Sequence, residues 1–407
     1  MRKLFKAIAG GVMILALATA CKSQQATLSE TYAGYAGSLL DSTFRYYQVK
    51  GTHLFNENYP KKEGEMVTYL AGTDTVRKDK VAYLWPTSGL FSAVNALLKA
   101  TGDARYADLL AKEILPGLRC YYDTTRLPAC YQSYLAESGH SDRFYDDNIW
   151  LGIDYLESYE LTRRPEYLAE AEGIWKFIES GRDTVLGDGV YWCEQKKESK
   201  NTCSNAPASV LALKLYAATK DKAYLKAGEQ LYQWTRKHLQ DPSDHLYWDN
   251  ISLKGDRIGK AKFAYNSGQM MQAAALLYGA TGDKAYLEDA KQLAAACDGY
   301  FFEDFTPANG ERFRALKNGN VWFTAIMMRG YEELYKIDHN PAYMDNFGKT
   351  LQYMWTHGRS ANGLFADDSF ARPAEHPKAS KWLLTQGAVA EMYARMAIVD
   401  KESNQKK

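Results

Sequence analysis

Thr101-Gly-Asp-Ala-Arg-Tyr106 is a short polar turn that recurs almost unchanged as Thr219-Lys-Asp-Lys-Ala-Tyr224 and Thr281-Gly-Asp-Lys-Ala-Tyr286. Two looser copies are Thr162-Arg-Arg-Pro-Glu-Tyr167 and His339-Asn-Pro-Ala-Tyr343. The centres of the five turns are 61, 57, 62 and 57 residues apart, at Asp103, Arg164, Asp221, Asp283 and Asn340. Self-similarity at a nearly fixed period is typical of a protein built from repeated supersecondary units.

The segments on the two sides of each turn differ in character. Segments before a turn, such as 206–218 and 267–280, are rich in Ala and carry few charges, whereas segments after a turn, such as 222–238 and 284–297, are charged and amphipathic. A helix that is apolar all round is buried, and one with a single apolar stripe lies at the surface. Six pairs of an inner and an outer helix predict an all-α fold, an (α/α)6 barrel of six helical hairpins. An open solenoid, which also stacks helix pairs, is the alternative.

The connections from an outer helix to the next inner helix are long, whereas the polar turns are short. The long connections span roughly residues 51–84, 120–142, 181–205, 241–264, 300–317 and 359–379. Long loops in compact domains are usually functional. Because each of them precedes an inner helix, we expect all six at one end of the barrel, where they surround a cleft.

Two adjacent carboxylates, Asp146 and Asp147, stand at the start of the second inner helix. Asp is a common N-cap, but one Asp is sufficient as a cap, and a second must be solvated, paired or used. Apolar residues follow at helical spacing, which places the pair on the first turn and facing the cleft. The competing pair Asp367-Asp368 lies inside a long loop and ranks second.

Most glycoside hydrolases use two neighbouring carboxyl groups as their catalytic residues. Retaining enzymes hold the nucleophile and the acid/base about 5–5.5 Å apart, and inverting enzymes about 6.5–9.5 Å apart. Adjacent positions on one helical turn favour the shorter separation. The helix N-terminus favours the attacking anion, whereas the other carboxyl, beside a like charge and aromatic rings, tends to stay protonated. The pair therefore predicts a retaining glycoside hydrolase.

Phe144-Tyr-Asp-Asp-Asn-Ile-Trp-Leu151 resembles the catalytic segment of glycoside hydrolase family 76, the endo-α-1,6-mannanases. The resemblance extends to Tyr265-Asn-Ser-Gly-Gln269 and to the Leu-Tyr-x-x-Thr-Gly-Asp-x-x-Tyr-Leu turns, and it spans roughly residues 28–399. It implies an (α/α)6 barrel that needs no metal and that cleaves α-1,6-mannosidic linkages, with retention, in mannan or mannan-derived oligosaccharides.

The resemblance also assigns roles to individual residues. Asp146 would be the nucleophile, Asp147 the acid/base, and Asn266 and Gln269 would lie near the −1 sugar. The family more often has Asn-Gln-Gly where this chain has Asn-Ser-Gly at 266–268. Further residues at inner-helix starts or with aromatic faces are candidates for sugar contacts: Trp85, Tyr145, Trp192, Asn205, Tyr265 and Trp382.

The N-terminus has the pattern of a bacterial lipoprotein. Basic residues within 1–6 precede an apolar run, 7–20, that is too short to span a bilayer. Leu17-Ala-Thr-Ala-Cys21 resembles a lipobox, with Ala18 where Leu is usual, and predicts a lipid on Cys21. Ordinary signal-peptidase cleavage just before Cys21 is the alternative.

These patterns predict a single catalytic domain held at a membrane. We expect a protein of the cell envelope, lipid-anchored, which faces either the periplasm or the outside. The expected parts are a lipoprotein signal peptide at 1–20, a tether at 21–27, the (α/α)6 domain at 28–400 and a polar tail at 401–407.

Composition excludes several other classes. The chain has 407 residues, of which 46% are hydrophobic and 24% charged, as in ordinary globular proteins. After residues 1–20 the chain has 47 basic and 49 acidic residues, so a nucleic-acid partner is not expected. GxGxxG, Walker A, GxSxG and HExxH motifs are absent from the sequence, and we expect neither a cofactor nor a metal. The acidic stretch 244–250 lacks the spacing of a calcium loop and is interpreted as a turn.

The cysteines after Cys21 leave two alternatives. Cys120 and Cys130 are ten residues apart, as are Cys193 and Cys203. In an oxidising compartment each pair could form a disulfide, and otherwise these residues are buried free thiols.

Two other functions are compatible with parts of the sequence. A non-catalytic, lipid-anchored glycan-binding protein would also use aromatic faces, but it has no need of two adjacent acids at a barrel mouth. Another (α/α)6 carbohydrate enzyme, such as an unsaturated-uronide hydrolase or a lyase, would need a basic cleft for its acidic substrate. The inner-helix starts offer only the isolated residues Arg143 and Lys381.

Overall fold

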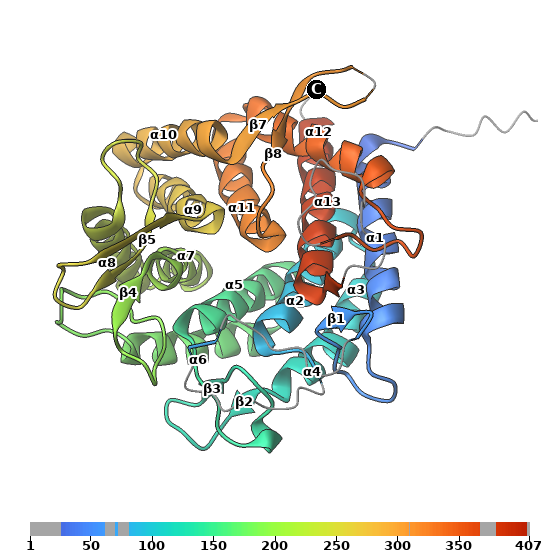
Figure 1. The fold of residues 1–407 in the computed structure, drawn as a ribbon. Helices are drawn as coiled ribbons and strands as arrows, with labels where there is room; N and C mark the ends of the chain where they lie inside the picture. The colour runs from blue at the N-terminus through green and yellow to red at the C-terminus, as the bar shows by residue number, and fades with distance from the viewer. Residues whose placement is uncertain (1–25, 62–69, 72–80, 309, 367–379, 405–407) are drawn as a thin grey trace, which may run out of the picture.

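The computed structural model describes residues 26–61, 70–71, 81–308, 310–366 and 380–404, which form two concentric rings of helices (Figure 1). The inner ring consists of α2 (Leu84–Thr101), α5 (Tyr145–Thr162), α7 (Thr202–Thr219), α9 (Ala264–Thr281), α11 (Val321–Asp338) and α13 (Leu383–Asn404). The outer ring consists of α1 (Leu28–Tyr47), α3 (Ala104–Leu109) with its continuation α4 (Leu115–Arg119), α6 (Pro165–Ser180), α8 (Lys222–Leu239), α10 (Lys284–Phe301) and α12 (Ala342–His357).

The inner ring is closed. Its helices contact one another in chain order from α2 to α13, and α13 returns to contact α2. This closure confirms the (α/α)6 barrel and excludes the open solenoid. One detail differs from the six predicted hairpins: five pairs are hairpins, and the sixth pairs the last helix, α13, with the first helix, α1.

The repeated turn works through local hydrogen bonds, as the copy at 219–224 illustrates. The Thr219 hydroxyl donates to the carbonyl of Leu215 (2.8 Å) and accepts from the backbone N–H of Asp221 (3.2 Å). Lys220 takes the left-handed conformation that ends the inner helix, with φ +63°, and the Asp221 carboxylate caps the next helix by accepting from Ala223 N–H (2.9 Å). The Thr therefore ends one helix and the Asp begins the next, which explains why both residue types recur.

The long connections contain short antiparallel strands above the N-termini of the inner helices. The pairs are β1 (Asn58–Tyr59) with β9 (Lys381–Trp382), β2 (Tyr122–Asp123) with β3 (Cys130–Tyr131), and β7 (Phe302–Phe305) with β8 (Phe313–Leu316). A three-stranded sheet has the order β4 (Ser199–Asn201), β5 (Trp248–Ser252), β6 (Ile258–Lys262).

The fourth residue of three inner helices fastens a loop to the barrel. In each case a side-chain amide accepts a hydrogen bond from one backbone N–H of the loop and donates to the carbonyl of the same residue. Each amide thus replaces a strand partner and satisfies two buried backbone groups. The clamps join Asn148 to Tyr131 (2.9 and 2.9 Å), Asn205 to Val190 (2.6 and 2.8 Å) and Gln386 to Phe365 (2.9 and 2.9 Å).

Buried ion pairs join the inner helices at the end of the barrel away from the loops. Arg395 on α13 binds Glu391 (2.7 Å), Glu332 on α11 (2.6 Å) and Glu157 on α5 (3.3 Å). Lys99 on α2 binds the same Glu332 (3.0 Å). Because removing one partner would leave an uncompensated buried charge, this network holds four helices of the ring in a fixed arrangement.

The first and last helices, α1 and α13, lie at the two ends of the described chain. The domain begins at α1, where Thr27 and Glu30 form a capping box. Helix α13 continues to Asn404, into the expected polar tail, and the Ser403 hydroxyl donates to the Val399 carbonyl (2.8 Å). Residues 1–25, which include the expected signal peptide and Cys21, lie outside the described residues. Among the helices of the described part, none combines the length and the apolar character of a membrane span.

Glycine sets the spacing between α9 and α11. A Cβ atom on Gly268 would lie 2.3 Å from the Cα atom of Met327, and one on Gly330 would lie 2.3 Å from the carbonyl oxygen of Gly268. The two backbones can therefore approach this closely only where both side chains are absent.

We predict that Gly268→Ala destabilises the fold by about 1–3 kcal/mol, because the added methyl group forces two backbones of the closed ring apart. The matched control is Gly279→Ala on the exposed face of the same helix, where an added Cβ meets nothing within 4 Å. Because alanine has a higher helix propensity than glycine, Gly279→Ala should leave stability unchanged or raise it by up to about 1 kcal/mol. Urea unfolding measures both variants, and equal midpoints for the two would contradict the prediction.

Candidate active site

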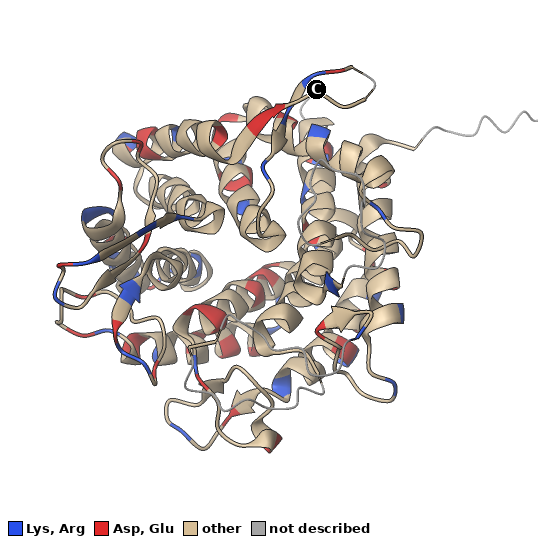
Figure 2. Ribbon diagram, viewed as in Figure 1, with Lys and Arg blue, Asp and Glu red and all other residues tan. Residues whose placement is uncertain are grey.

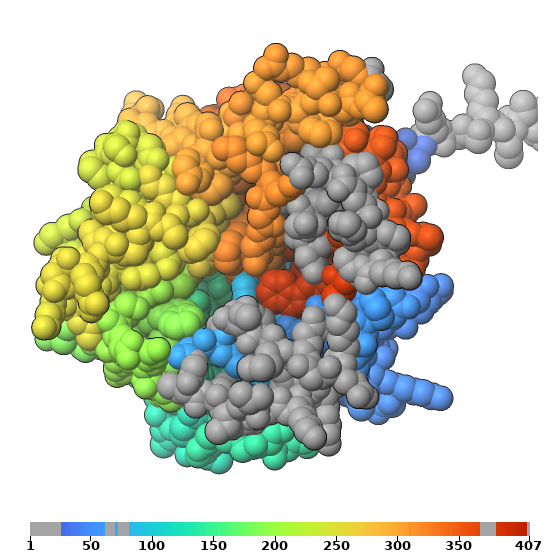
Figure 3. Space-filling model, viewed as in Figure 1, coloured from blue at the N-terminus to red at the C-terminus, as the bar shows by residue number. Residues whose placement is uncertain are grey.

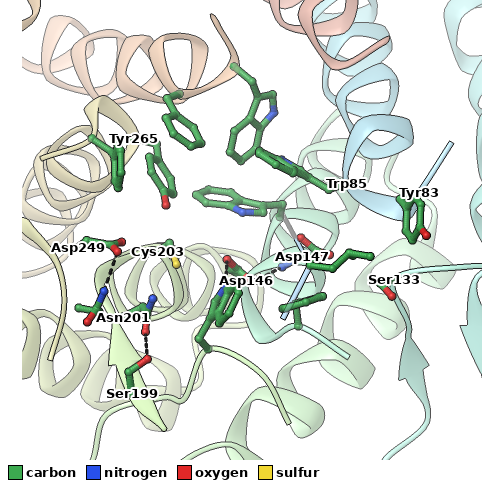
Figure 4. Close-up of a pocket in the computed structure, with 18 residues that line it drawn as sticks. Tyr83, Trp85, Ser133, Asp146, Asp147, Ser199, Asn201, Cys203, Asp249 and Tyr265 are labelled. Atoms are coloured by element: carbon green, nitrogen blue, oxygen red, sulfur yellow. Dashed lines mark hydrogen bonds between the residues drawn. The ribbon is translucent and has the colours of Figure 1, made fainter. Parts of the chain in front are cut away.

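The first turn of α5 holds the predicted carboxylate pair at the mouth of the inner ring. Asp146 and Asp147 both line a cavity of about 550 Å³. A hollow near the middle of this face of the molecule is visible in Figure 3, and Figure 4 shows both carboxylates among the residues that line the cavity. The other lining residues come from five inner-helix starts and from the loops above them.

Asp146 receives hydrogen bonds, whereas Asp147 does not. The indole N–H of Trp192 donates to Asp146 Oδ2 (3.2 Å), and the backbone N–H of Asp147 donates to Asp146 Oδ1 (3.1 Å). The Cys203 thiol on α7 approaches the same carboxylate. Among the residues that the structure describes, the Asp147 carboxyl has no hydrogen-bond donor.

Burial separates the protonation states of the two groups. Burial raises the pKa of Asp146 to about 6, while hydrogen bonds from Cys203, the backbone and Trp192 work in the opposite direction. Burial, with repulsion from Asp146, raises the pKa of Asp147 well above its usual range. Asp146 is therefore the carboxylate that ionises first, and Asp147 is the one that keeps its proton.

A backbone bridge positions Trp192 against Asp146. Tyr145 N–H donates to the Trp192 carbonyl (2.9 Å), and Glu194 N–H donates to the Arg143 carbonyl (3.0 Å). The Arg143 guanidinium, fully buried, donates to both carboxylate oxygens of Glu194 (2.7 and 2.5 Å). Arg143 thus fastens the Trp192 loop to the start of α5.

Aromatic rings form the walls of the cavity. Trp322 meets Trp85 and Trp150 edge-on, with ring centroids 5.4 and 5.1 Å apart. Tyr265 stacks on Phe323 at 4.1 Å. Such flat apolar faces remove water from the carboxylates and suit the apolar faces of sugar rings.

Sequence reasoning missed a third carboxylate, Asp249 on β5. It lines the cavity across from the pair, accepts a hydrogen bond from the Asn250 amide (2.7 Å), and has its pKa raised by burial. Figure 4 shows it beside Cys203 and Tyr265. The interpretation of 244–250 as a turn is wrong for its second half, where β5 begins at Trp248, and the aromatic and β-branched residues of 246–251 are typical of a strand.

The charged residues that line the cavity are acidic. The described lining residues include three Asp and neither Lys nor Arg. In Figure 2 acidic residues mark α5 near the centre of the ring, whereas most basic residues lie on the outer helices and the loops around them. The cavity therefore favours a neutral ligand over an anionic one.

The structure brings five of the ten predicted catalytic and binding residues together. They are the residues that line the cavity: Trp85, Asp146, Asp147, Trp192 and Tyr265.

The other five do not line the described part of the cavity. Four of them lie on inner helices, where neighbouring positions point about 100° apart. Tyr145 faces the outer ring and stacks on Phe177 (4.6 Å), and Asn205 is a loop clamp rather than part of the described cavity lining. Trp382 packs behind Trp85 (5.2 Å) and donates to Glu57 (2.5 Å).

Asn266 and Gln269 are fully buried and do not line the described part of the cavity. Both follow Tyr265 on α9, and the Gln269 amide donates to Gln272 within the same helix (2.8 Å). Their expected position next to the −1 sugar stays a prediction.

The acidic side chains of the loop near Asp241 are paired with a lysine from a neighbouring strand. Lys262 on β6 lies 2.6 Å from both Asp241 and Asp244. Within the described ranges, no group of three or more His, Cys, Asp or Glu side chains is arranged to hold a metal ion.

The five described cysteines are free thiols. Neither Cys120 and Cys130 nor Cys193 and Cys203 form a disulfide in the structure, so the free-thiol alternative holds. Cys120 is exposed, and Cys130, Cys193 and Cys203 are buried.

A closed (α/α)6 barrel with two adjacent carboxyl groups in the cavity at its mouth has the paired acids that a glycoside hydrolase requires. Residues 41–362 match the model of glycosyl hydrolase family 76. The chain belongs to this family, and the resemblance found in the sequence is confirmed.

Solved structures with the same fold include two bacterial relatives. A family 76 mannosidase from Bacteroides thetaiotaomicron is 32% identical, with a TM-score of 0.82 over 92% of this chain and 100% of that one. An α-1,6-mannanase from a Salegentibacter species is 25% identical, with a TM-score of 0.70 over 90% of this chain and 99% of that one. An inactive variant of the latter enzyme, with two consecutive aspartates replaced by asparagine, is in complex with α-1,6-mannotriose.

Curated fungal proteins match over shorter stretches. A mannan endo-1,6-α-mannosidase of Saccharomyces cerevisiae is 25% identical over 264 residues, which are 60% of this chain and 55% of that protein. The chain spans between 35% and 63% of the length of the curated relatives that it matches.

We predict that Asp147→Asn stabilises the fold at pH 7. The pKa of Asp147 is higher in the folded state than the unfolded value of about 3.9, so stability falls as the pH rises from about 4 toward the folded pKa. An uncharged amide removes this loss, and we expect a melting temperature at least about 2 °C above wild type at pH 7.

Calorimetry at pH 7 and pH 3.5 tests this expectation, because the advantage should shrink at the lower pH. The control is Asp283→Asn at the exposed N-cap of α10, where Asn caps as well as Asp. A wild type as stable as Asp147→Asn at both pH values would show that the carboxyl group is not strained by burial.

Proposed function

We propose that this protein hydrolyses α-1,6-mannosidic bonds in mannan or mannan-derived oligosaccharides by a retaining mechanism. The observation that carries the proposal is the pair of adjacent, half-buried carboxyl groups that line the cavity at the mouth of the barrel. Asp146 is the nucleophile, and Asp147 is the acid/base.

The first half of the reaction uses both groups at once. An Asp146 oxygen attacks the anomeric carbon of the sugar, and the bond from that carbon to the glycosidic oxygen breaks. Asp147 gives its proton to the departing oxygen, so the leaving sugar departs as an alcohol. The product on the protein is a glycosyl ester of Asp146, beside an ionised Asp147.

The second half reverses these roles. Asp147, now a base, takes a proton from a water molecule, whose oxygen attacks the same anomeric carbon and displaces Asp146. Two inversions restore the original anomeric configuration, and each carboxyl group regains its starting state.

The surroundings of the pair fit this division of labour. The indole of Trp192 and the backbone N–H at the start of α5 stabilise the Asp146 anion. Aromatic walls keep Asp147 poorly solvated and protonated until the glycosidic oxygen receives its proton. The rings of Trp85 and Tyr265 are placed to pack on pyranose faces.

Two features support a neutral mannan as the substrate. The described cavity lining has three carboxylates and neither Lys nor Arg, which disfavours the acidic sugars of uronide hydrolases and lyases. The α-1,6-mannanase activity named for the Salegentibacter relative and the mannan endo-1,6-α-mannosidase activity named for the yeast relative support the linkage. The paired aspartates of the inactive Salegentibacter variant support a catalytic aspartate pair.

We predict that the purified protein releases oligosaccharides from unbranched α-1,6-mannan, and that Asp146→Asn and Asp147→Asn each lower the rate at least about a thousandfold. Products are resolved by size, and a ladder of sizes indicates endo action. Proton NMR of the first product formed should show the α anomer.

Variants of the competing pair provide the control. Asp367→Asn and Asp368→Asn should keep the wild-type rate, because residues 367–379, outside the described part of the structure, belong to a loop in our sequence assignment. An initial β anomer would replace the retaining mechanism with an inverting one. A third outcome is that neither the wild type nor any variant releases products, although all of them bind to a mannan column. The protein would then be a glycan-binding member of its family.

We further propose that a lipid on Cys21 anchors the protein in the cell envelope. The apolar run 7–20, the small residues before Cys21, and the short polar segment between Cys21 and α1 support this proposal. The first helix begins at Leu28, so the tether is about seven residues long.

We predict that the wild-type protein, expressed in a Gram-negative host, incorporates a fatty-acid analogue and sediments with membranes. Cys21→Ser should abolish the label, because the thiol is the acceptor of the lipid. Cys120→Ser, which alters the exposed cysteine of the barrel, should keep it. An unlabelled wild type in the soluble envelope fraction would instead indicate ordinary signal-peptidase cleavage.

A further inference from the structure

Cys203 occupies an unusual place for a cysteine in this chain. It lies on the first turn of α7, is 3% exposed, and lines the cavity with the carboxylate pair. Figure 4 shows its sulfur between Asp146 and Tyr265, with the Tyr265 hydroxyl directed toward it. Three inner helices, α5, α7 and α9, thus bring one side chain each to the same point.

The positions of the three side chains suit a chain of hydrogen bonds. With the Tyr265 hydroxyl directed toward the Cys203 sulfur and the sulfur next to Asp146, the hydroxyl can donate to the sulfur and the thiol to the Asp146 carboxylate. Burial raises the pKa of the Cys203 thiol well above its usual value, so the sulfur keeps its proton and remains a donor. Tyr265 is itself fixed by its stack on Phe323.

We infer that Cys203 is a positioning residue for the nucleophile Asp146, with Tyr265 orienting its thiol. This inference rests on the proposed function, in which Asp146 attacks the anomeric carbon. Cys203 forms no bond to the sugar and transfers no proton in either half of the reaction, and it acts through Asp146.

A thiol suits this position because it is a weak donor. Asp146 loses its negative charge when it forms the glycosyl ester, so a strong donor would stabilise the carboxylate before attack more than during it. Trp192 and the Asp147 N–H already donate to Asp146. A third contact through sulfur fixes the orientation of the carboxylate and lowers its nucleophilicity less than a hydroxyl would.

The opposing interpretation is that Cys203 only fills space, since buried cysteines often behave as small apolar residues. The two interpretations differ in the titration of Asp146. A donor stabilises the Asp146 anion and therefore holds its pKa down, whereas a filler has no such effect.

The test compares Cys203→Ala with Cys203→Ser, using the full-length protein and α-1,6-mannan as the substrate. We expect Cys203→Ala to lower kcat about tenfold with little change in KM, and to move the acid limb of kcat/KM about 0.5–1 pH unit higher. Cys203→Ser retains a donor, so its acid limb should lie at or below that of wild type, with a rate within a few-fold.

Two further variants exclude a purely structural effect. Tyr265→Phe keeps the stacked ring and removes the hydroxyl, and it should shift the acid limb in the same direction by a smaller amount. Cys297→Ala removes a buried thiol from α10, on the outer ring, and should leave the pH profile unchanged. Melting temperatures show which variants fold. If Cys203→Ala does not fold, Tyr265→Phe still tests whether the thiol is held against Asp146 by the Tyr265 hydroxyl.

A Cys203→Ala enzyme with the wild-type acid limb and kcat would overturn the inference, as would equal upward shifts for Ala and Ser. A wild type that leaves α-1,6-mannan intact would be a failure of the proposed function alone. Carboxyl 13C NMR separates the two failures, because the pKa of Asp146 should still rise in Cys203→Ala without any substrate.

Discussion

The burial of the inner helices on all sides is the constraint on which the rest of the structure depends. Each inner helix packs against two neighbours in the ring and against the outer ring, so its middle accepts mainly apolar or fully paired side chains. Polar side chains in the middle of the ring are therefore paired with one another, as Arg329 is with Glu391 (2.7 Å). The two ends of the helices differ in their chemistry. One end holds the buried ion pairs around Arg395, and the other offers free backbone N–H groups, which stabilise a carboxylate such as Asp146.

Because of the same constraint, residues that fasten loops and residues that face the cavity occupy similar positions at the mouth. Asn148 and Asn205 fasten loops, and Asp146 and Asp147 face the cavity, yet all four lie on the first turns of inner helices. The distinction is one of direction, since positions one residue apart point about 100° apart on a helix. Sequence reasoning found the pair because two adjacent acids exceed what a cap requires, but it had no comparable argument for Asn205.

The sequence was most informative where local chemistry repeats, and least where distant segments meet. The Thr and Asp of the polar turns make hydrogen bonds within a few residues, so the repeat predicted the barrel. Asp249 reaches the cavity only because β5 pairs with β4 and β6 above α7, and the contact of Cys203 with Asp146 depends on how α5 and α7 pack. Neither arrangement has a local pattern. The pairing of α1 with α13 escaped prediction for the same reason.

That pairing fixes where the chain leaves the barrel. The backbone N–H of Ser29, near the start of α1, donates to Asp400 near the end of α13 (3.0 Å), at the end of the ring opposite the loops. A tether that precedes Leu28 therefore emerges from the pole opposite the cavity. If Cys21 carries the lipid that we propose, the end of the barrel opposite the cavity would be the one attached to the bilayer, and the cavity would be accessible to polymer from the surrounding medium.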